Sequence, residues 1–157
     1  MAYHDDLFAH ALALVHISPP TQLTLRRAVS AAYYAVFHLL IYEATSNWGD
    51  VSLRTALGRA YEHGVMKTAS NRIVDTKKFP FVGEDATLVN SLRFVGRTFS
   101  ELQEAREFAD YNLTKTLGPA EALAQVKSAE RIFSTWPSIR GHQIAQAYLV
   151  SLLVKRT

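Results

Sequence analysis

Residues 31–42 read AAYYAVFHLLIY, and this stretch decides the fold class. In a helix, these apolar and aromatic side chains would occupy every side, which is typical of a helix that is buried all round. The helix is expected to run from about Thr21 to Asn47, where the sequence NWGD (47–50) ends it. A buried helix of this length needs other helices packed around it.

Apolar residues spaced by three and four predict these further helices, and 7 glycines, 5 prolines and no alternating runs give strands little support. A first helix is expected from about Tyr3 to Ile17, with Leu7, Ala11, Leu14 and Ile17 on its inner face. A shorter helical stretch is expected from Val51 to about His63, followed by a long connector from Val65 to Asp85.

The second half of the chain predicts three more segments. The third long helix is expected from about Asp85 to Asn112, as an antiparallel mate of the central helix, and its apolar seam has alternating steps of four and three. The seam residues are Leu88, Leu92, Val95, Phe99 and Leu102. Gly118-Pro119 should open a fourth helix, and the inner residues up to Pro137 are Leu123, Val126, Phe133 and Trp136. Ser138 should cap a final helix with Ile144, Ala147, Leu149, Leu152 and Leu153 on its inner face.

Composition points to one self-sufficient domain. The chain has 157 residues, of which 48% are hydrophobic, so residues 1–157 are expected to form a single all-α domain, an antiparallel up-and-down bundle of four to five helices. The absence of cysteine fits a reducing compartment, and no signal sequence or bilayer-spanning run is apparent. We therefore expect a cytoplasmic protein with no membrane association. A net charge of +3 permits a phosphate-rich partner without indicating one.

Metal and cofactor chemistry has little support. The six histidines show no helical pair with a carboxylate at zinc-ligand spacing, and no glycine-rich phosphate loop or nucleophile motif is present. We expect no metal and no cofactor.

Polar residues interrupt the apolar surface of the central helix along one stripe. Arg27, Ser30, Tyr34 and His38 follow each other at steps of three, four and four, so they share one face. The favoured interpretation is a seam that faces solvent or satisfies its own hydrogen bonds. The alternative is a binding surface.

An arginine also interrupts the seam of the third helix. Continuing that repeat beyond Leu102 reaches Arg106, which Asp110 can meet one turn later, as Tyr111 can meet Glu107. A paired structural arginine and a guanidinium that binds phosphate or a carboxylate are about equally favoured.

A cluster of cations and aromatic rings in the middle of the chain is a second candidate for nucleic-acid contact, although an ordinary solvated connector is favoured. Its members are Arg54, Arg59, Tyr61, Lys67, Arg72, Lys77, Lys78, Phe79 and Phe81.

Two strings, LRRAVSAAYYAVFH (25–38) and REFADY (106–111), resemble the HEPN family over the helical core, about residues 5 to 135. That resemblance implies an antiparallel helical bundle that commonly dimerises. Many members are metal-independent ribonucleases of toxin or phage-defence systems, and others are non-catalytic nucleotide- or nucleic-acid-binding modules. A toxin–antitoxin pairing would bring a nucleotidyltransferase as partner.

The nuclease members have an arginine followed, after four to six residues, by a histidine. Here Arg106 takes the arginine position and Tyr111 the histidine position, and a phenol with a pKa near 10 is a poor general base at neutral pH. The favoured interpretation is a dimeric, non-catalytic module that binds RNA or a nucleotide in a cleft. The expected lining residues are Arg27, Tyr34, His38, Arg106, Asp110 and Tyr111. The alternatives are a divergent endoribonuclease that uses Arg106 with His38 or Tyr111, and a dimeric interaction module with no small ligand.

Overall fold

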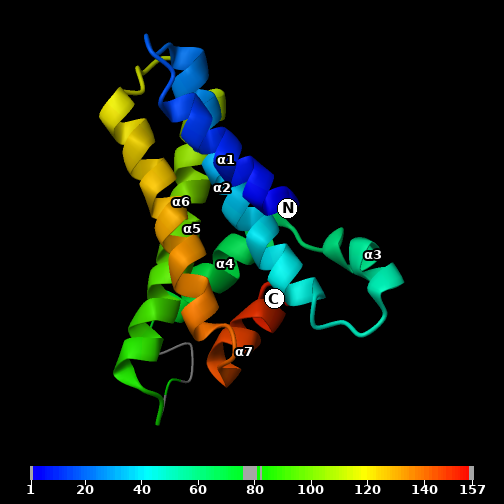
Figure 1. Cartoon of the computed structure of the whole chain (residues 1–157). Helices are drawn as coiled ribbons and strands as arrows, with labels where there is room; N and C mark the ends of the chain where they lie inside the picture. Colours follow the sequence, from blue (N-terminus) through cyan, green and yellow to red (C-terminus); the bar gives the residue numbers. More distant parts are fainter. Residues whose placement is uncertain (1, 76–80, 82, 156–157) are drawn as a thin grey trace. The chain divides into compact units, whose positions relative to one another are not determined.

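A computed structural model describes the chain except residues 1, 76–80, 82 and 156–157 (Figure 1). Over the described residues it contains seven α-helices, one 3-10 helix and no strand, so the all-α prediction is confirmed. The elements are α1 (Tyr3–Val15), α2 (Gln22–Thr45), η1 (Val51–Leu53), α3 (Arg54–Gly58), α4 (His63–Val74), α5 (Ala86–Tyr111), α6 (Pro119–Ile139) and α7 (Gln143–Ser151).

The chain divides into two compact units. Unit 1 comprises Met1–Leu39 and Glu101–Phe133, and unit 2 comprises Leu40–Ser100 and Ser134–Thr157. The helices α2, α5 and α6 each contribute residues to both units. The single domain expected over 1–157 stays a prediction.

The burial predicted for α2 is confirmed over most of its circumference but not along the stripe of Arg27, Ser30, Tyr34 and His38, which is exposed or only partly buried. Apolar side chains no more than 9% exposed cover the other sides of this helix: Leu25, Ala28, Val29, Ala31, Ala32, Tyr33, Ala35, Val36, Phe37, Leu39 and Leu40. The predicted seam of α5 is also buried, at Leu88, Leu92, Val95, Phe99 and Leu102. Each of these two long helices has too much apolar surface to face solvent, so packing against other helices stabilises it.

The predicted connector from Val65 to Asp85 is wrong over its first half, because α4 spans His63–Val74. The buried face of α4 consists of Met66, Ala69, Ser70 and Ile73. It includes only two large apolar side chains, so its helical period was hidden among polar neighbours. The predicted residues Lys77, Lys78 and Phe79 lie outside the described part of the chain.

The predicted ends of the terminal helices also need correction. Pro137 does not end α6, which continues to Ile139, and Ser138 lies within α6 and caps no helix. The burial of Trp136 and Ile139 outweighs the backbone donor that proline lacks. Ala147 is exposed in α7, where Tyr148 takes the buried position instead, and Ile17 lies beyond α1 and is 44% exposed.

Two sets of side-chain hydrogen bonds connect helices of unit 2. Glu43 accepts two hydrogen bonds from Arg140, at 3.0 Å from Nε and 2.7 Å from Nη2, and its side chain is only 9% exposed. The buried hydroxyls of Ser70 and Tyr148 lie 2.7 Å apart and join α4 to α7. Polar pairs with at least one buried member favour one arrangement of the helices, because separating them would leave a buried polar group without a partner.

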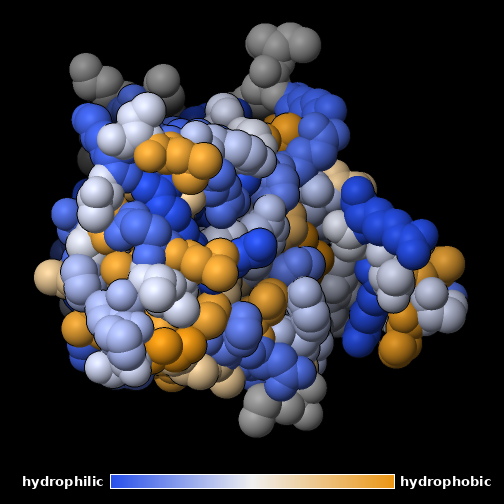
Figure 2. All heavy atoms as spheres, turned by 90° about the horizontal axis from the view of Figure 1, so that it is seen from above, coloured by the Kyte–Doolittle hydropathy of each residue, from blue (hydrophilic) through white to orange (hydrophobic). Residues whose placement is uncertain are grey.

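The surface shows no single dominant apolar face in the view of Figure 2, where hydrophobic side chains lie in small groups between hydrophilic ones. Among the described residues, no helix is both long and apolar enough to cross a membrane.

Candidate functional site

The first turns of α2 and the last turn of α5 enclose an open hollow of about 510 Å³ in unit 1. Its lining consists of Leu23, Arg26, Arg27, Ser30, Tyr34, Ala109, Asp110, Tyr111 and Leu113. Four of the six residues predicted for a binding cleft, Arg27, Tyr34, Asp110 and Tyr111, are therefore brought together.

Arg26 positions the two walls of this hollow. Its Nη1 donates to the carbonyl oxygens of Phe108 at 3.3 Å, Ala109 at 3.0 Å and Asn112 at 2.8 Å, and its Nη2 donates to the carbonyl of Lys115. The last carbonyls of a helix have no partner within the helix and carry the negative end of its dipole. The guanidinium of Arg26 therefore caps α5 with a positive charge.

Gln22 extends this arrangement to the loop between α5 and α6. Its Oε1 accepts from the backbone amide of Leu117 at 3.0 Å, and its Nε2 donates to the Leu117 carbonyl at 2.8 Å. The same Oε1 accepts from Nε of Arg26 at 3.2 Å. Gln22 and Arg26 thus fix the start of α2 to the backbone at the end of α5 and in the loop that follows it.

Arg27 is free where Arg26 is not. Its side chain is exposed, and it makes no ion pair or hydrogen bond with any residue that the structure describes. Tyr111, across the hollow, is 75% exposed, and Leu23 and Leu113 are 66% and 78% exposed. The hollow therefore offers one unpaired cation together with an accessible ring and apolar flanks.

Arg106 lies in the core beside the hollow and not in its lining. It is 8% exposed, and its guanidinium carbon lies 5.2 Å from the ring centre of Tyr33 and 5.8 Å from that of Tyr34. Its Nη1 lies 3.8 Å from Oδ2 of Asp110, so the predicted contact one turn away is confirmed. Within the described part of the chain, its buried Nε has no hydrogen-bond partner.

The phenol of Tyr33 is held neutral beside this arginine. Burial raises the pKa of Tyr33 well above its ordinary value, and the positive charge of Arg106 offsets only part of that effect. Tyr33 therefore contacts Arg106 as a neutral phenol and not as a counter-ion.

His38, the sixth predicted residue, belongs to an aromatic cluster next to the hollow. Its ring meets that of Tyr3 edge-on at 4.9 Å and that of Phe37 at 5.2 Å, and it lies 6.4 Å from that of Tyr34. Tyr34 thus contacts both Arg106 and His38, while only Tyr34 of these three lines the hollow.

Some side chains of the alternative basic cluster in the middle of the chain already have structural contacts or are buried. Arg54 donates to the carbonyls of Ser46 at 3.1 Å and Trp48 at 2.9 Å, which holds the turn after α2. Tyr61 is only 8% exposed. These two side chains are therefore poor candidates for contact with a polynucleotide.

No described group of three or more histidine, aspartate or glutamate side chains is arranged to hold a metal ion. Comparisons of this chain with family models, with curated proteins and with solved structures found no match.

Proposed function

We propose that this protein is a HEPN-like, non-catalytic module that binds single-stranded RNA, or a nucleotide as its smallest unit, in the hollow of unit 1. The observation that carries the proposal is the unpaired, exposed Arg27 opposite the exposed ring of Tyr111 across one hollow. A cation beside an aromatic platform is the usual combination in sites for single-stranded nucleic acid.

Each lining group has a role in this proposal. The planar fork of Arg27 contacts a phosphate, because guanidinium geometry matches two phosphate oxygens. The ring of Tyr111 stacks on a base, with Leu23 and Leu113 as apolar flanks. Ser30 and Asp110 can hydrogen-bond a base edge or the ribose 2′-hydroxyl.

Size and charge are consistent with a nucleotide. A volume of about 510 Å³ lies within the ordinary range for small-molecule sites, roughly 300 to 1,000 Å³. Arg106 is Asp110's ion-pair partner, so the charge of Arg27 is the one left for the ligand. Arg106 then has a positioning role, in which it holds Tyr34 and Asp110 in the wall.

The direct test is a fluorescence titration of labelled oligouridylate at about 50 and about 200 mM salt. Affinity should fall as salt rises, and Arg27→Ala should weaken binding about tenfold and lower the salt slope by about one. Arg97→Ala is the matched control, since Arg97 is an exposed arginine of α5 outside the hollow. Equal losses in the two variants would place the binding site elsewhere.

Stacking has its own pair of variants. Tyr111→Ala should weaken binding by about 1–3 kcal/mol, while Tyr111→Phe should bind like the wild type because the ring is retained. Uridine monophosphate as competitor distinguishes a nucleotide site from one that requires a polynucleotide.

The rival functions give different results. If purified protein cleaves cellular RNA in the presence of chelator, and Arg106→Ala abolishes the cleavage, the protein is an endoribonuclease that uses Arg106 with His38 or Tyr111. No RNA or nucleotide binding at low salt would favour a dimeric interaction module. The resemblance further leads us to propose a homodimer and a nucleotidyltransferase partner, which size-exclusion chromatography and co-purification test.

A further inference from the structure

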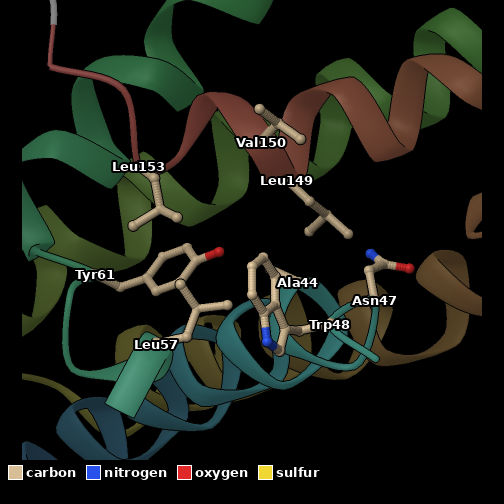
Figure 3. A pocket seen from close by; sticks show the side chains of 8 residues that line it. All are labelled: Ala44, Asn47, Trp48, Leu57, Tyr61, Leu149, Val150 and Leu153. Atoms are coloured by element: carbon tan, nitrogen blue, oxygen red, sulfur yellow. The ribbon is translucent and has the colours of Figure 1, made fainter. Parts of the chain in front are cut away.

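Unit 2 contains a second pocket, of about 240 Å³, between the end of α2, α3 and α7 (Figure 3). Its lining consists of Ala44, Asn47, Trp48, Leu57, Tyr61, Leu149, Val150 and Leu153. None of these residues belongs to the hollow of unit 1, so the pocket requires its own explanation.

Tyr61 supplies the unusual feature of this pocket. Its side chain is 8% exposed, and its hydroxyl points toward the side of Trp48 and Leu149 (Figure 3). Within the described residues this hydroxyl makes no hydrogen bond. The hydroxyl opens onto the pocket, so a ligand with an acceptor atom can take a hydrogen bond from it there.

Burial raises the pKa of Tyr61, so the hydroxyl keeps its proton and can donate. The amide nitrogen of Asn47 is already engaged, because Nδ2 donates to Oε1 of Gln146 at 2.7 Å and to the Glu43 carbonyl at 3.3 Å. The Tyr61 hydroxyl therefore presents a hydrogen-bond donor to a pocket lined mainly by apolar side chains.

The walls limit the shape of the ligand. Leu57, Leu149 and Leu153 form an aliphatic lining, and the flat ring of Trp48 is 52% exposed beside them. The volume exceeds that of a cavity of about 150 Å³ that takes benzene, and it lies below that of most drug-sized sites. One or two fused rings fit these limits.

We propose that the pocket around Tyr61 binds a planar, largely apolar molecule of one or two fused rings that accepts one hydrogen bond from the Tyr61 hydroxyl and lies against Trp48. This inference goes beyond RNA binding and does not depend on it, because it concerns other residues and another ligand chemistry.

The test is an NMR titration of the full-length, ¹⁵N-labelled protein, which follows the two tryptophan indole N–H signals. Quinoline, which has a ring nitrogen as acceptor, and naphthalene, which has none, are the two probes. Both should shift the signal of Trp48, while the signal of Trp136, fully buried and outside the pocket, should stay in place. No shift of Trp48 at millimolar quinoline would overturn the proposal.

Two variants separate the hydrogen bond from the apolar fit. Tyr61→Phe should weaken quinoline binding about tenfold, the loss of about one hydrogen bond, and leave naphthalene binding unchanged. Tyr42→Phe is the control, since Tyr42 is an exposed tyrosine of the same unit outside the pocket. Equal quinoline affinity in Tyr61→Phe and the wild type would overturn the proposed hydrogen bond from the Tyr61 hydroxyl to the ligand.

A third variant and a dilution series complete the experiment. Ala44→Leu should narrow the pocket and weaken both probes, and unchanged binding of both would show that they bind elsewhere. If the Trp48 signal of the protein alone shifts on dilution, a second copy of the chain occupies the pocket, which would overturn a small-molecule site.

Discussion

At the scale of single residues, three arginines of unit 1 differ in what their guanidinium groups contact. Arg26 donates its hydrogen bonds to backbone carbonyls at the end of α5. Arg106 lies between two tyrosine rings and Asp110. Arg27 remains exposed without a described partner. Identical side chains therefore have a capping role, a packing role and, in our proposal, a ligand-binding role.

Arg26→Ala should lower the free energy of unfolding by about 2–4 kcal/mol, because it leaves the last carbonyls of α5 without their donor. Arg27→Ala, at the next position, should change it by no more than about 0.5 kcal/mol. Urea denaturation at neutral pH measures both. Equal effects would contradict the capping role of Arg26.

These residue roles were predictable only where the partners are close in sequence. The Arg106–Asp110 contact follows from a spacing of four on one helix. The carbonyls that Arg26 binds lie 82 to 89 residues away, and no local pattern indicates such a contact. Likewise, the helical stripe of α2 places His38 on the same face as Tyr34 but cannot show that Tyr3 covers it.

Tyr148 predicts a loss of stability in alkali. Burial raises the pKa of Tyr148, while an unfolded tyrosine titrates near pH 10. Below about pH 10 both states are protonated and the stabilisation is fully present. As pH rises further, only the unfolded chain loses the proton, so the free energy of unfolding falls by up to about 1.4 kcal/mol per pH unit.

Tyr148→Phe should cost about 1 kcal/mol at pH 7, because the hydrogen bond to Ser70 is lost, and should make the alkaline decline less steep. Part of the decline should remain, since burial also raises the pKa of Tyr33. Urea denaturation between about pH 8 and pH 11 tests this. Parallel curves for the two proteins would rule out Tyr148 as a source of the decline.

At the scale of elements, α4 and α5 meet where Gly96 has no side chain. A Cβ at Gly96 would lie 2.3 Å from Cδ1 of Ile73 and 2.9 Å from the carbonyl oxygen of Ser70. The second of these is backbone on α4, so repacking of Ile73 alone cannot remove the clash. The close approach of the two helices depends on this glycine.

Gly96→Ala should therefore lower the free energy of unfolding by about 2 kcal/mol or more, despite the better helix propensity of alanine. Gly64→Ala in α4 is the control, because no atom lies within 4 Å of its added Cβ, and it should be neutral or slightly stabilising. Thermal unfolding followed by circular dichroism compares the two. Destabilisation of equal size in both would contradict the close packing at Gly96.

The elements themselves were predictable in proportion to their apolar content. The long helix α2 follows from its nearly continuous run of apolar residues, and α5 follows from its regular apolar seam. The helix α4 was missed because its buried face includes a serine, which is satisfied by Tyr148 and the Met66 carbonyl, contacts that only the folded chain provides. The end of α6 was misplaced because tertiary packing overrides the proline signal.

At the scale of the whole molecule, two compact units carry two cavities of different chemistry. The hollow of unit 1 has arginine, serine and aspartate in its lining, whereas the pocket of unit 2 is mostly aliphatic and aromatic. The division into units could not be predicted, because α2, α5 and α6 are continuous helices with residues in both. A periodic pattern indicates which face is buried but not which contacts cluster together.

Ultraviolet cross-linking of oligouridylate to the wild-type protein, with identification of the linked residues by mass spectrometry, tests RNA binding in the hollow most directly. A base stacked on Tyr111 or Tyr34 should give cross-links at those residues, and Arg27→Ala should reduce their yield. Cross-links confined to residues outside the hollow, or a yield that Arg27→Ala leaves unchanged, would contradict the account.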